Sequence, residues 1–253
     1  MLRGVFLFFF CLLLTSSSPD QTLSGQVTQP APSGADQSVQ ANTRVRSFGP
    51  PDARISVVRL KVPLNARRLY EAALHAWGKH ASAEAQKRLD QALEIDSTFP
   101  EALTLRGAIE AAYQRWDSAE QNLSAAIQID PGYSPAYVIL AAVYNAQSRY
   151  DEAQAAIEQA LSAGACTWSV QYEIARAMIG KGDYADALAV TETALRSNHG
   201  ALIHLAKAHA MLGLGRYPEA TVELRTYLRD DPNGDGSEDA RDLLQRLETL
   251  GSR

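Results

Sequence analysis

Small and apolar positions recur about every 34 residues between residues 66 and 234. Self-similarity at such a period is typical of a repeat architecture, in which each copy is one small structural unit. Three columns of small residues recur in phase, and small side chains at these positions let two helices approach closely. Each copy is therefore predicted to be a pair of short helices. The three columns are Ala73, Gly107, Ala141, Ala175 and Ala208; Ala85, Ala119, Ala153, Ala187 and Ala220; and Ala92, Ala126, Ala160 and Ala194.

Larger side chains are expected to fill the seam between the paired helices. An aromatic residue stands three positions before the middle column in four copies, and a leucine or isoleucine stands four positions after it in four copies. The turn between the two helices is predicted near Gly182 and Asp183, or near Gly215 and Arg216. No copy buries its apolar face alone, so stacking of neighbouring copies should stabilise the array. The seam residues are Trp116, Tyr150, Tyr184, Tyr217, Leu89, Leu123, Ile157 and Leu224.

This set of columns resembles the tetratricopeptide repeat family. The resemblance implies an all-α fold, a right-handed α-solenoid of about five helix-turn-helix repeats followed by a C-terminal capping helix. Departures from the pattern at Ser97, Ala165, Thr191 and Tyr227 concern local geometry more than architecture. The five copies are expected at residues 66–99, 100–133, 134–167, 168–200 and 201–234.

Residues 235–253 are predicted to form the capping helix. Ser237 can cap its start, and the apolar residues after it have the i, i+3, i+4, i+7 spacing of an amphipathic helix. A terminal repeat needs a polar outer face, so we interpret this helix as a solubility cap. A partner-binding helix is the alternative. The apolar stripe consists of Ala240, Leu243, Leu244, Leu247 and Leu250.

The amino terminus has the pattern of an export signal over residues 1–17. Arg3 gives a basic start, eleven apolar residues follow from Gly4 to Leu14, and Thr15 to Ser18 are small. Spanning a bilayer needs about 20 apolar residues, so this run matches a cleaved signal peptide better than a membrane helix. The alternatives are an uncleaved anchor or a buried apolar helix.

Two further segments precede the array. Residues 18–54 are rich in Ser, Gln, Pro, Thr and Gly and carry few large apolar residues, so a disordered spacer is expected. Residues 55–65 include a partly alternating stretch, Ile55 to Val62, that ends at Pro63. An extended strip that covers the first helix is the favoured interpretation, and a partner-binding arm is the alternative.

Composition supports a globular helical body and argues against nucleic-acid binding. The chain is 46% apolar and 21% charged, and 38 of its 41 alanines lie after residue 50. A net charge of −5 and the lack of a long basic block disfavour a nucleic-acid partner. After removal of Cys11 with the signal, Cys166 has no cysteine in the chain with which to pair.

No catalytic or cofactor-binding constellation stands out. The histidines form two groups, His75 with His80 and His199 with His204 and His209, and the spacing of five residues within each group does not place two on one helix face. We expect no enzymatic activity and no cofactor. One candidate metal site has the alternating oxygens of a calcium loop, although Asp-Pro-Asn is also an ordinary turn between repeats, and the closing ligand is a short aspartate. Its ligands would be Asp231, Asn233, Asp235 and Asp242.

The family resemblance also implies a binding surface. The first helix of each pair would line a concave groove that holds a protein or peptide, with aromatic and arginine anchors. Packing against neighbouring copies is the alternative role for any one of these side chains. The expected groove residues are Arg67, Tyr70, Trp77, Thr104, Asn145, Tyr172, Arg176 and His209.

These observations predict an exported, non-enzymatic interaction scaffold, periplasmic or secreted, from a bacterium. One alternative is an envelope assembly factor or chaperone-like adaptor. Another is a regulatory subunit of a separate enzyme.

Overall fold

A computed structural model of the chain describes residues 61–165, 167–197, 200–234 and 236–251. The predicted signal peptide, the spacer and residues 55–60 lie outside the described residues. The described part contains eleven helices and no strand. The helices are α3 (Leu64–Gly78), α4 (Ser82–Ile95), α5 (Pro100–Ala112), α6 (Trp116–Ile129), α7 (Ser134–Ala146), α8 (Tyr150–Ser162), α9 (Trp168–Lys181), α10 (Tyr184–Ser197), α11 (Ala201–Gly213), α12 (Tyr217–Asp230) and α13 (Ser237–Gly251).

Helices α3 to α12 form five antiparallel pairs, each joined by the same tight turn. One residue in each turn has a left-handed backbone, and in the first three copies it is not glycine. The backbone N–H of the residue after it bonds five positions back, as in Arg149 to Tyr144 and Asp183 to Met178. This is the Schellman arrangement, which satisfies carbonyl groups at the end of the first helix. The left-handed residues are His80, Gln114, Ser148, Gly182 and Gly215.

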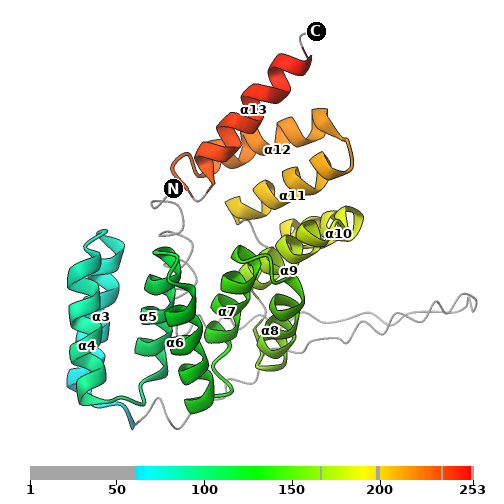
Figure 1. The fold of residues 1–253 in the computed structure, drawn as a ribbon. Helices are drawn as coiled ribbons and strands as arrows, with labels where there is room; N and C mark the ends of the chain where they lie inside the picture. Colours follow the sequence, from blue (N-terminus) through cyan, green and yellow to red (C-terminus); the bar gives the residue numbers. More distant parts are fainter. Residues whose placement is uncertain (1–60, 166, 198–199, 235, 252–253) are drawn as a thin grey trace, which may run out of the picture.

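The pairs stack in one direction to make a curved two-layer array (Figure 1). Each first helix packs on the next first helix, so that α5 contacts α7, α7 contacts α9, and α9 contacts α11. The second helices α4, α6, α8 and α10 pack mainly against the first helices on either side of them. Successive first helices therefore lie closer together than successive second helices. The first helices therefore form the inner, concave layer.

The three predicted columns of small residues form the closest packing in the array. Their thirteen alanines, from Ala73 to Ala220, are all 0% exposed. Gly107 replaces alanine in one of these positions, and a Cβ there would lie 2.8 Å from Leu123 Cγ, so an alanine would displace that side chain. The seam residues Leu89, Leu123 and Leu224 are also fully buried. The predicted all-α solenoid is thus the fold of the described chain.

The aromatic residues of the second helices contact the next copy. A Cβ at Gly180, near the end of α9, would lie 2.2 Å from two ring atoms of Tyr150 at the start of α8. The same relationship joins Gly213 of α11 to Tyr184 of α10. These rings lie across the boundary between copies, whereas the sequence pattern placed them within the seam of their own pair.

Helix α13 completes the described chain. It packs on α12 through Ala240, which is 0% exposed, and through Leu243, Leu244 and Leu247, which are partly buried. Its opposite side carries exposed polar residues such as Glu238 and Arg241. None of the described helices has both the length and the apolar character needed to cross a membrane.

Candidate functional site

The first helices are buried on more sides than the second helices. Eleven of the thirteen residues of α5 are buried, whereas only Ala119, Leu123 and Ala126 are buried in α6. Some of the buried residues of the first helices belong to the inner side of the array, which we call the concave face. Its residues share one face of each first helix, because they are spaced three or four positions apart. The positions that the repeat pattern assigns to the concave face are Thr104 and Ala108 of α5, Val138, Ala142 and Asn145 of α7, and Tyr172 and Arg176 of α9.

Two buried polar atoms on the concave face have no hydrogen-bond partner among the described residues. Thr104 is 0% exposed, and its Oγ1 is unpaired. Asn145 is 6% exposed, and its Oδ1 is unpaired. A buried polar atom without a partner costs about 1–3 kcal/mol, so native proteins leave few of them. Both oxygens are closed to solvent in this structure, so a ligand could reach them only after neighbouring side chains move.

The other end of the Asn145 amide is held by α9. Its Nδ2 donates to the backbone O of Glu173 at 3.0 Å and to Glu173 Oε2 at 2.8 Å. This contact fixes the orientation of the amide, because the reverse orientation would place Oδ1 against the carboxylate. Asn145 Oδ1 is therefore the atom of this amide that has no hydrogen-bond partner among the described residues, and it is buried.

Glu173 is a fully buried carboxylate beneath the concave face. Arg176 Nη1 donates to both of its carboxylate oxygens, at 3.2 and 3.1 Å. Burial raises the pKa of Glu173 above its ordinary value, although Arg176 and Asn145 oppose the shift. The guanidinium of Arg176 also lies 5.6 Å from the ring centroid of Tyr172. The cluster joins α7 to α9 and contains three of the predicted groove residues.

His209 of α11 borders this cluster. It is partly buried, and burial lowers its pKa. The positive charge of Arg176 also lowers the pKa, while Asp239 of α13 raises it. The imidazole therefore favours its neutral form, which can either donate or accept a hydrogen bond.

The first copy supplies an aromatic border. Tyr70 is partly buried, and its ring centroid lies 5.2 Å from that of Phe99. Arg67 is also partly exposed, whereas Trp77 is 0% exposed. Of the predicted groove residues, Trp77, Thr104, Asn145 and Tyr172 are buried. The side chains of Arg67, Tyr70, Arg176 and His209 are partly open to solvent.

Sequence reasoning missed Glu173. The equivalent positions in the two preceding copies, one and two periods upstream, are Ile139 and Leu105. A carboxylate in a column that is apolar in neighbouring copies is the signal that could have identified it, because a buried charge requires a partner.

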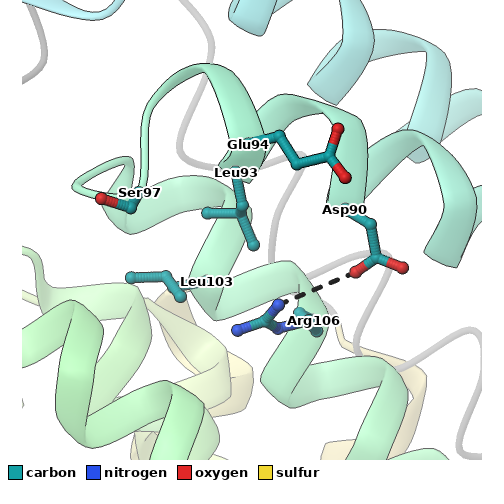
Figure 2. A pocket seen from close by; sticks show the side chains of 6 residues that line it. All are labelled: Asp90, Leu93, Glu94, Ser97, Leu103 and Arg106. Atoms are coloured by element: carbon teal, nitrogen blue, oxygen red, sulfur yellow. Dashed lines mark ion pairs between the residues drawn. The ribbon is translucent and has the colours of Figure 1, made fainter.

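A hollow lies between α4 and α5 (Figure 2). It has a volume of about 500 Å³. Arg106 lies between two polar groups there, since its Nη1 is 3.7 Å from Asp90 Oδ1 and its Nε donates to Asn122 Oδ1 at 2.8 Å. The Arg106 guanidinium thus already has two partners. The lining residues are Asp90, Leu93, Glu94, Ser97, Leu103 and Arg106.

The predicted calcium loop is only partly described. Asp235 lies outside the described residues. Burial raises the pKa of Asp231, while a hydrogen bond with the backbone of Asn233 opposes the shift. In the described part of the chain, no cluster of three or more His, Cys, Asp or Glu side chains could hold a metal ion. Calcium binding by Asp231, Asn233, Asp235 and Asp242 stays a prediction.

Comparison with protein families supports the repeat interpretation. The profile of the tetratricopeptide repeat family matches residues 110–165 and 178–247. No curated protein matches the chain.

Solved structures of the same fold are similar over most of the array. A thermophilic repeat protein from Thermus thermophilus is 18% identical and has a TM-score of 0.64, covering 73% of this chain and 99% of its own. PilW, a type IV pilus biogenesis factor, is 14% identical with a TM-score of 0.62, covering 74% and 92%. PilF of Pseudomonas aeruginosa is 17% identical with a TM-score of 0.59, covering 74% and 85%. At these identities the similarity concerns the fold.

Proposed function

Because this chain belongs to the tetratricopeptide repeat family, we propose that it is a non-enzymatic scaffold that binds an extended segment of a partner protein on its concave face. The stacking of successive first helices into a concave layer carries this proposal. The unpaired oxygens of Thr104 and Asn145 are buried, so a ligand would reach them only after neighbouring side chains move. Asn145 Oδ1 can only accept a hydrogen bond, so its ligand must offer a donor. An extended polypeptide offers one backbone N–H at every residue except proline. Main-chain hydrogen bonds of this kind give affinity, and side-chain pockets give specificity.

The rest of the concave face suits such a ligand. Ala108 and Ala142 are small, so a peptide backbone can approach the helices closely. Tyr70, Tyr172 and Arg176 belong to the residue types that most often anchor protein interfaces. The partner segment would lie across α5, α7 and α9, with the aromatic border of α3 at one end.

We further propose that the protein works after export, in the periplasm or outside the cell. The support is the basic start and short apolar run of residues 1–17. Mass spectrometry of the protein recovered from the extracytoplasmic fraction of its host should find an amino terminus near residue 18. Recovery of a chain that retains Met1 would mean that residues 1–17 are not cleaved and act as an anchor.

The concave face can be tested by photo-crosslinking in the host. Tyr70→p-benzoylphenylalanine replaces one aromatic side chain by another on the border of the groove. A matched control carries the same replacement at Tyr217, which is 56% exposed at the start of α12. We expect the Tyr70 variant to capture a partner that the Tyr217 variant does not. Mass spectrometry then gives the partner segment.

A synthetic fluorescent peptide of that segment allows a quantitative test. Thr104→Val keeps the shape of the side chain and removes a hydroxyl that has no partner, so the fold should be at least as stable. Loss of one hydrogen bond to the ligand should weaken binding about 5- to 10-fold. Thr191→Val is the control, because Thr191 is buried on α10 and its hydroxyl donates to Leu188 O at 2.8 Å. Equal affinity of the wild-type and Thr104→Val proteins would contradict the proposed site.

A further inference from the structure

A second hollow opens on the outer side of the array, between α6 and α8, with α7 as its floor. Its volume is about 420 Å³. Successive second helices pack mainly on the first helix between them, so the outer layer is open at this boundary. Of its apolar side chains only Leu140 and Ala156 are buried, so a ligand can contact the others in this structure. The apolar lining consists of Ile127, Tyr137, Leu140, Tyr144, Ala155 and Ala156.

The equivalent hollow one copy upstream is occupied by polar contacts. In the hollow of Figure 2, Arg106 lies between Asp90 and Asn122 and interacts with both. One period of 34 residues downstream, the chain replaces the arginine by leucine and its two partners by serine and alanine. The hollow between α6 and α8 is therefore open and mainly apolar, which is typical of a binding site. The three downstream residues are Leu140, Ser124 and Ala156.

The helices around this hollow carry only acidic charge. α6 contains Asp117 and Glu120, α8 contains Asp151, Glu152 and Glu158, and α7 has no charged residue. None of these three helices contains Lys, Arg or His. Glu152 lines the hollow itself, and all of these acids except Glu120 are exposed.

Two cations from flanking segments offset part of this charge. Arg149 lies 3.0 Å from a carboxylate oxygen of Glu120 and 3.0 Å from one of Glu152. Lys181 lies 2.7 Å from Asp151 Oδ1. Five acids against two cations still leave the surface around the hollow acidic. It therefore attracts a basic ligand and repels an acidic one.

The shape of the hollow suits a helix. Tyr137, Leu140 and Tyr144 are spaced i, i+3 and i+7 along the floor and span about 10 Å. Apolar residues with the same spacing on a partner helix cover the same length. The walls are helices whose backbone groups bond within each helix, so they offer no sheet edge to an extended segment. A partner helix satisfies its own backbone bonds and presents only side chains.

We propose that the outer hollow between α6 and α8 binds a basic amphipathic helix of a partner protein. The apolar side chains of that helix enter the hollow, and its Lys and Arg side chains face the acids of α6 and α8. This surface is separate from the concave face, so the proposal does not depend on the function proposed above. A scaffold with both surfaces can hold two partners at once.

A designed peptide tests the chemistry of the occupant. The probe, called the lysine helix, is a fluorescent synthetic peptide of about 18 residues, long enough to form a helix. It has leucine at i, i+3, i+4 and i+7 spacing and lysine elsewhere. We expect it to bind the full chain, as its host processes it, at least about tenfold more tightly than the same helix with glutamate in place of lysine. Equal affinity for the two peptides, or no binding of the lysine helix, would overturn the proposal.

Matched variants test the location. Ala155→Lys places a cation in the hollow at an exposed position of α8, and lysine is a good helix former, so the fold should be retained. Gln121→Lys is the control, because Gln121 is the exposed equivalent one period upstream. We expect Ala155→Lys to weaken binding of the lysine helix at least about fivefold and Gln121→Lys to leave it unchanged. Equal affinity of these two variants would place the peptide elsewhere and overturn the proposal.

Photo-crosslinking tests for other occupants. The purified full chain carries Tyr137→p-benzoylphenylalanine in the floor of the hollow and is illuminated with the lysine helix present. We expect a crosslink to the peptide. A crosslink to a second copy, or to another segment of the same chain, in place of the peptide would overturn the proposal. Thr104→Val, which tests the concave face, should leave binding of the lysine helix unchanged, so the two proposals can fail separately.

Discussion

Asn145 of α7 and Glu173 of α9 join two neighbouring copies through a buried polar contact. The Asn145 amide donates at 2.8 Å to a carboxylate oxygen of a residue that is 0% exposed. It donates at 3.0 Å to the backbone carbonyl of the same residue. A solenoid depends on contacts between adjacent copies, so this pair contributes to the interface as well as to the concave face.

Asn145→Ala should destabilise the array. It removes the two hydrogen bonds that Asn145 Nδ2 donates to Glu173 and leaves Arg176 as the remaining donor to the buried carboxylate, at a cost of about 1–3 kcal/mol. The melting temperature should fall by about 3–10 °C in a calorimetric scan. Gln121→Ala, at an exposed position of α6, should stay within about 0.5 kcal/mol of the wild type. A melting temperature of Asn145→Ala equal to that of Gln121→Ala would show that the contact contributes nothing.

The buried carboxylate predicts a dependence of stability on pH. Burial raises the pKa of Glu173 in the folded state, so between its unfolded and folded pKa values the folded protein binds more protons than the unfolded chain. This contribution to stability is present below the unfolded pKa and is lost as pH rises through the folded pKa. Glu173→Gln keeps the shape and removes the charge. Its melting temperature relative to wild type should rise by at least about 2 °C from pH 5 to pH 8. A difference that is constant across this range would refute the argument.

The architecture could be predicted from the sequence because the close packing of paired helices requires a small residue at the same positions in each copy. A column such as Ala85, Ala119 and Ala153 is constrained in every copy by the same helix-helix contact, so it recurs with the period of the repeat. The turns were harder to recognise. His80, Gln114 and Ser148 adopt a left-handed backbone that glycine adopts in the later copies, so residue type alone did not mark the position.

The candidate site was less predictable for a physical reason. Its polar groups occur once each and follow no period, so no column reveals them. Asn145 and Arg176 were expected to face a partner, and the structure shows that both also contact Glu173. Trp77 was also expected to face a partner, but it is fully buried. The helical spacing that lines a groove also places side chains in the packing between copies.

The contact between Gly180 and Tyr150 predicts a cost for a single methyl group. A Cβ at Gly180 would lie 2.2 Å from the ring, so Gly180→Ala must displace Tyr150. Overpacking costs about 1–3 kcal/mol, and the higher helix propensity of alanine offsets about 1 kcal/mol of that. Calorimetry or urea unfolding should therefore show a net loss of up to about 2 kcal/mol.

Two controls isolate the clash. At Gly132, between α6 and α7, a Cβ would meet only Asp130 Oδ1 at 3.4 Å, so Gly132→Ala should change stability by less than about 0.5 kcal/mol. In a Tyr150→Ala background the space is free, so adding Gly180→Ala should cost nothing or stabilise the helix. The explanation fails if Gly180→Ala is equally harmful with and without the Tyr150 ring.

A second polar cluster, on α6 to α8, allows a prediction about the pKa of one tyrosine. Tyr144 donates through its hydroxyl to Glu120 Oε1 at 2.9 Å, and the Arg149 guanidinium lies 4.3 Å from its ring centroid. Burial raises the pKa of Tyr144, and the hydrogen bond and negative charge of Glu120 raise it further, while Arg149 lowers it. Glu120→Gln removes the charge, so the pKa of Tyr144 should move back toward its ordinary value.

Tyrosine labelled with carbon-13 at the ring carbon that bears the hydroxyl reports this titration by NMR, and Tyr144→Phe assigns the signal. Tyr144→Phe should also cost about 0.5–1.5 kcal/mol of stability, because it leaves Glu120 without one donor. Arg149 still holds Glu120 Oε2 at 3.0 Å, which keeps this loss small. An unchanged Tyr144 titration in Glu120→Gln would mean that the carboxylate does not act on the phenol. Burial alone would then account for the raised pKa.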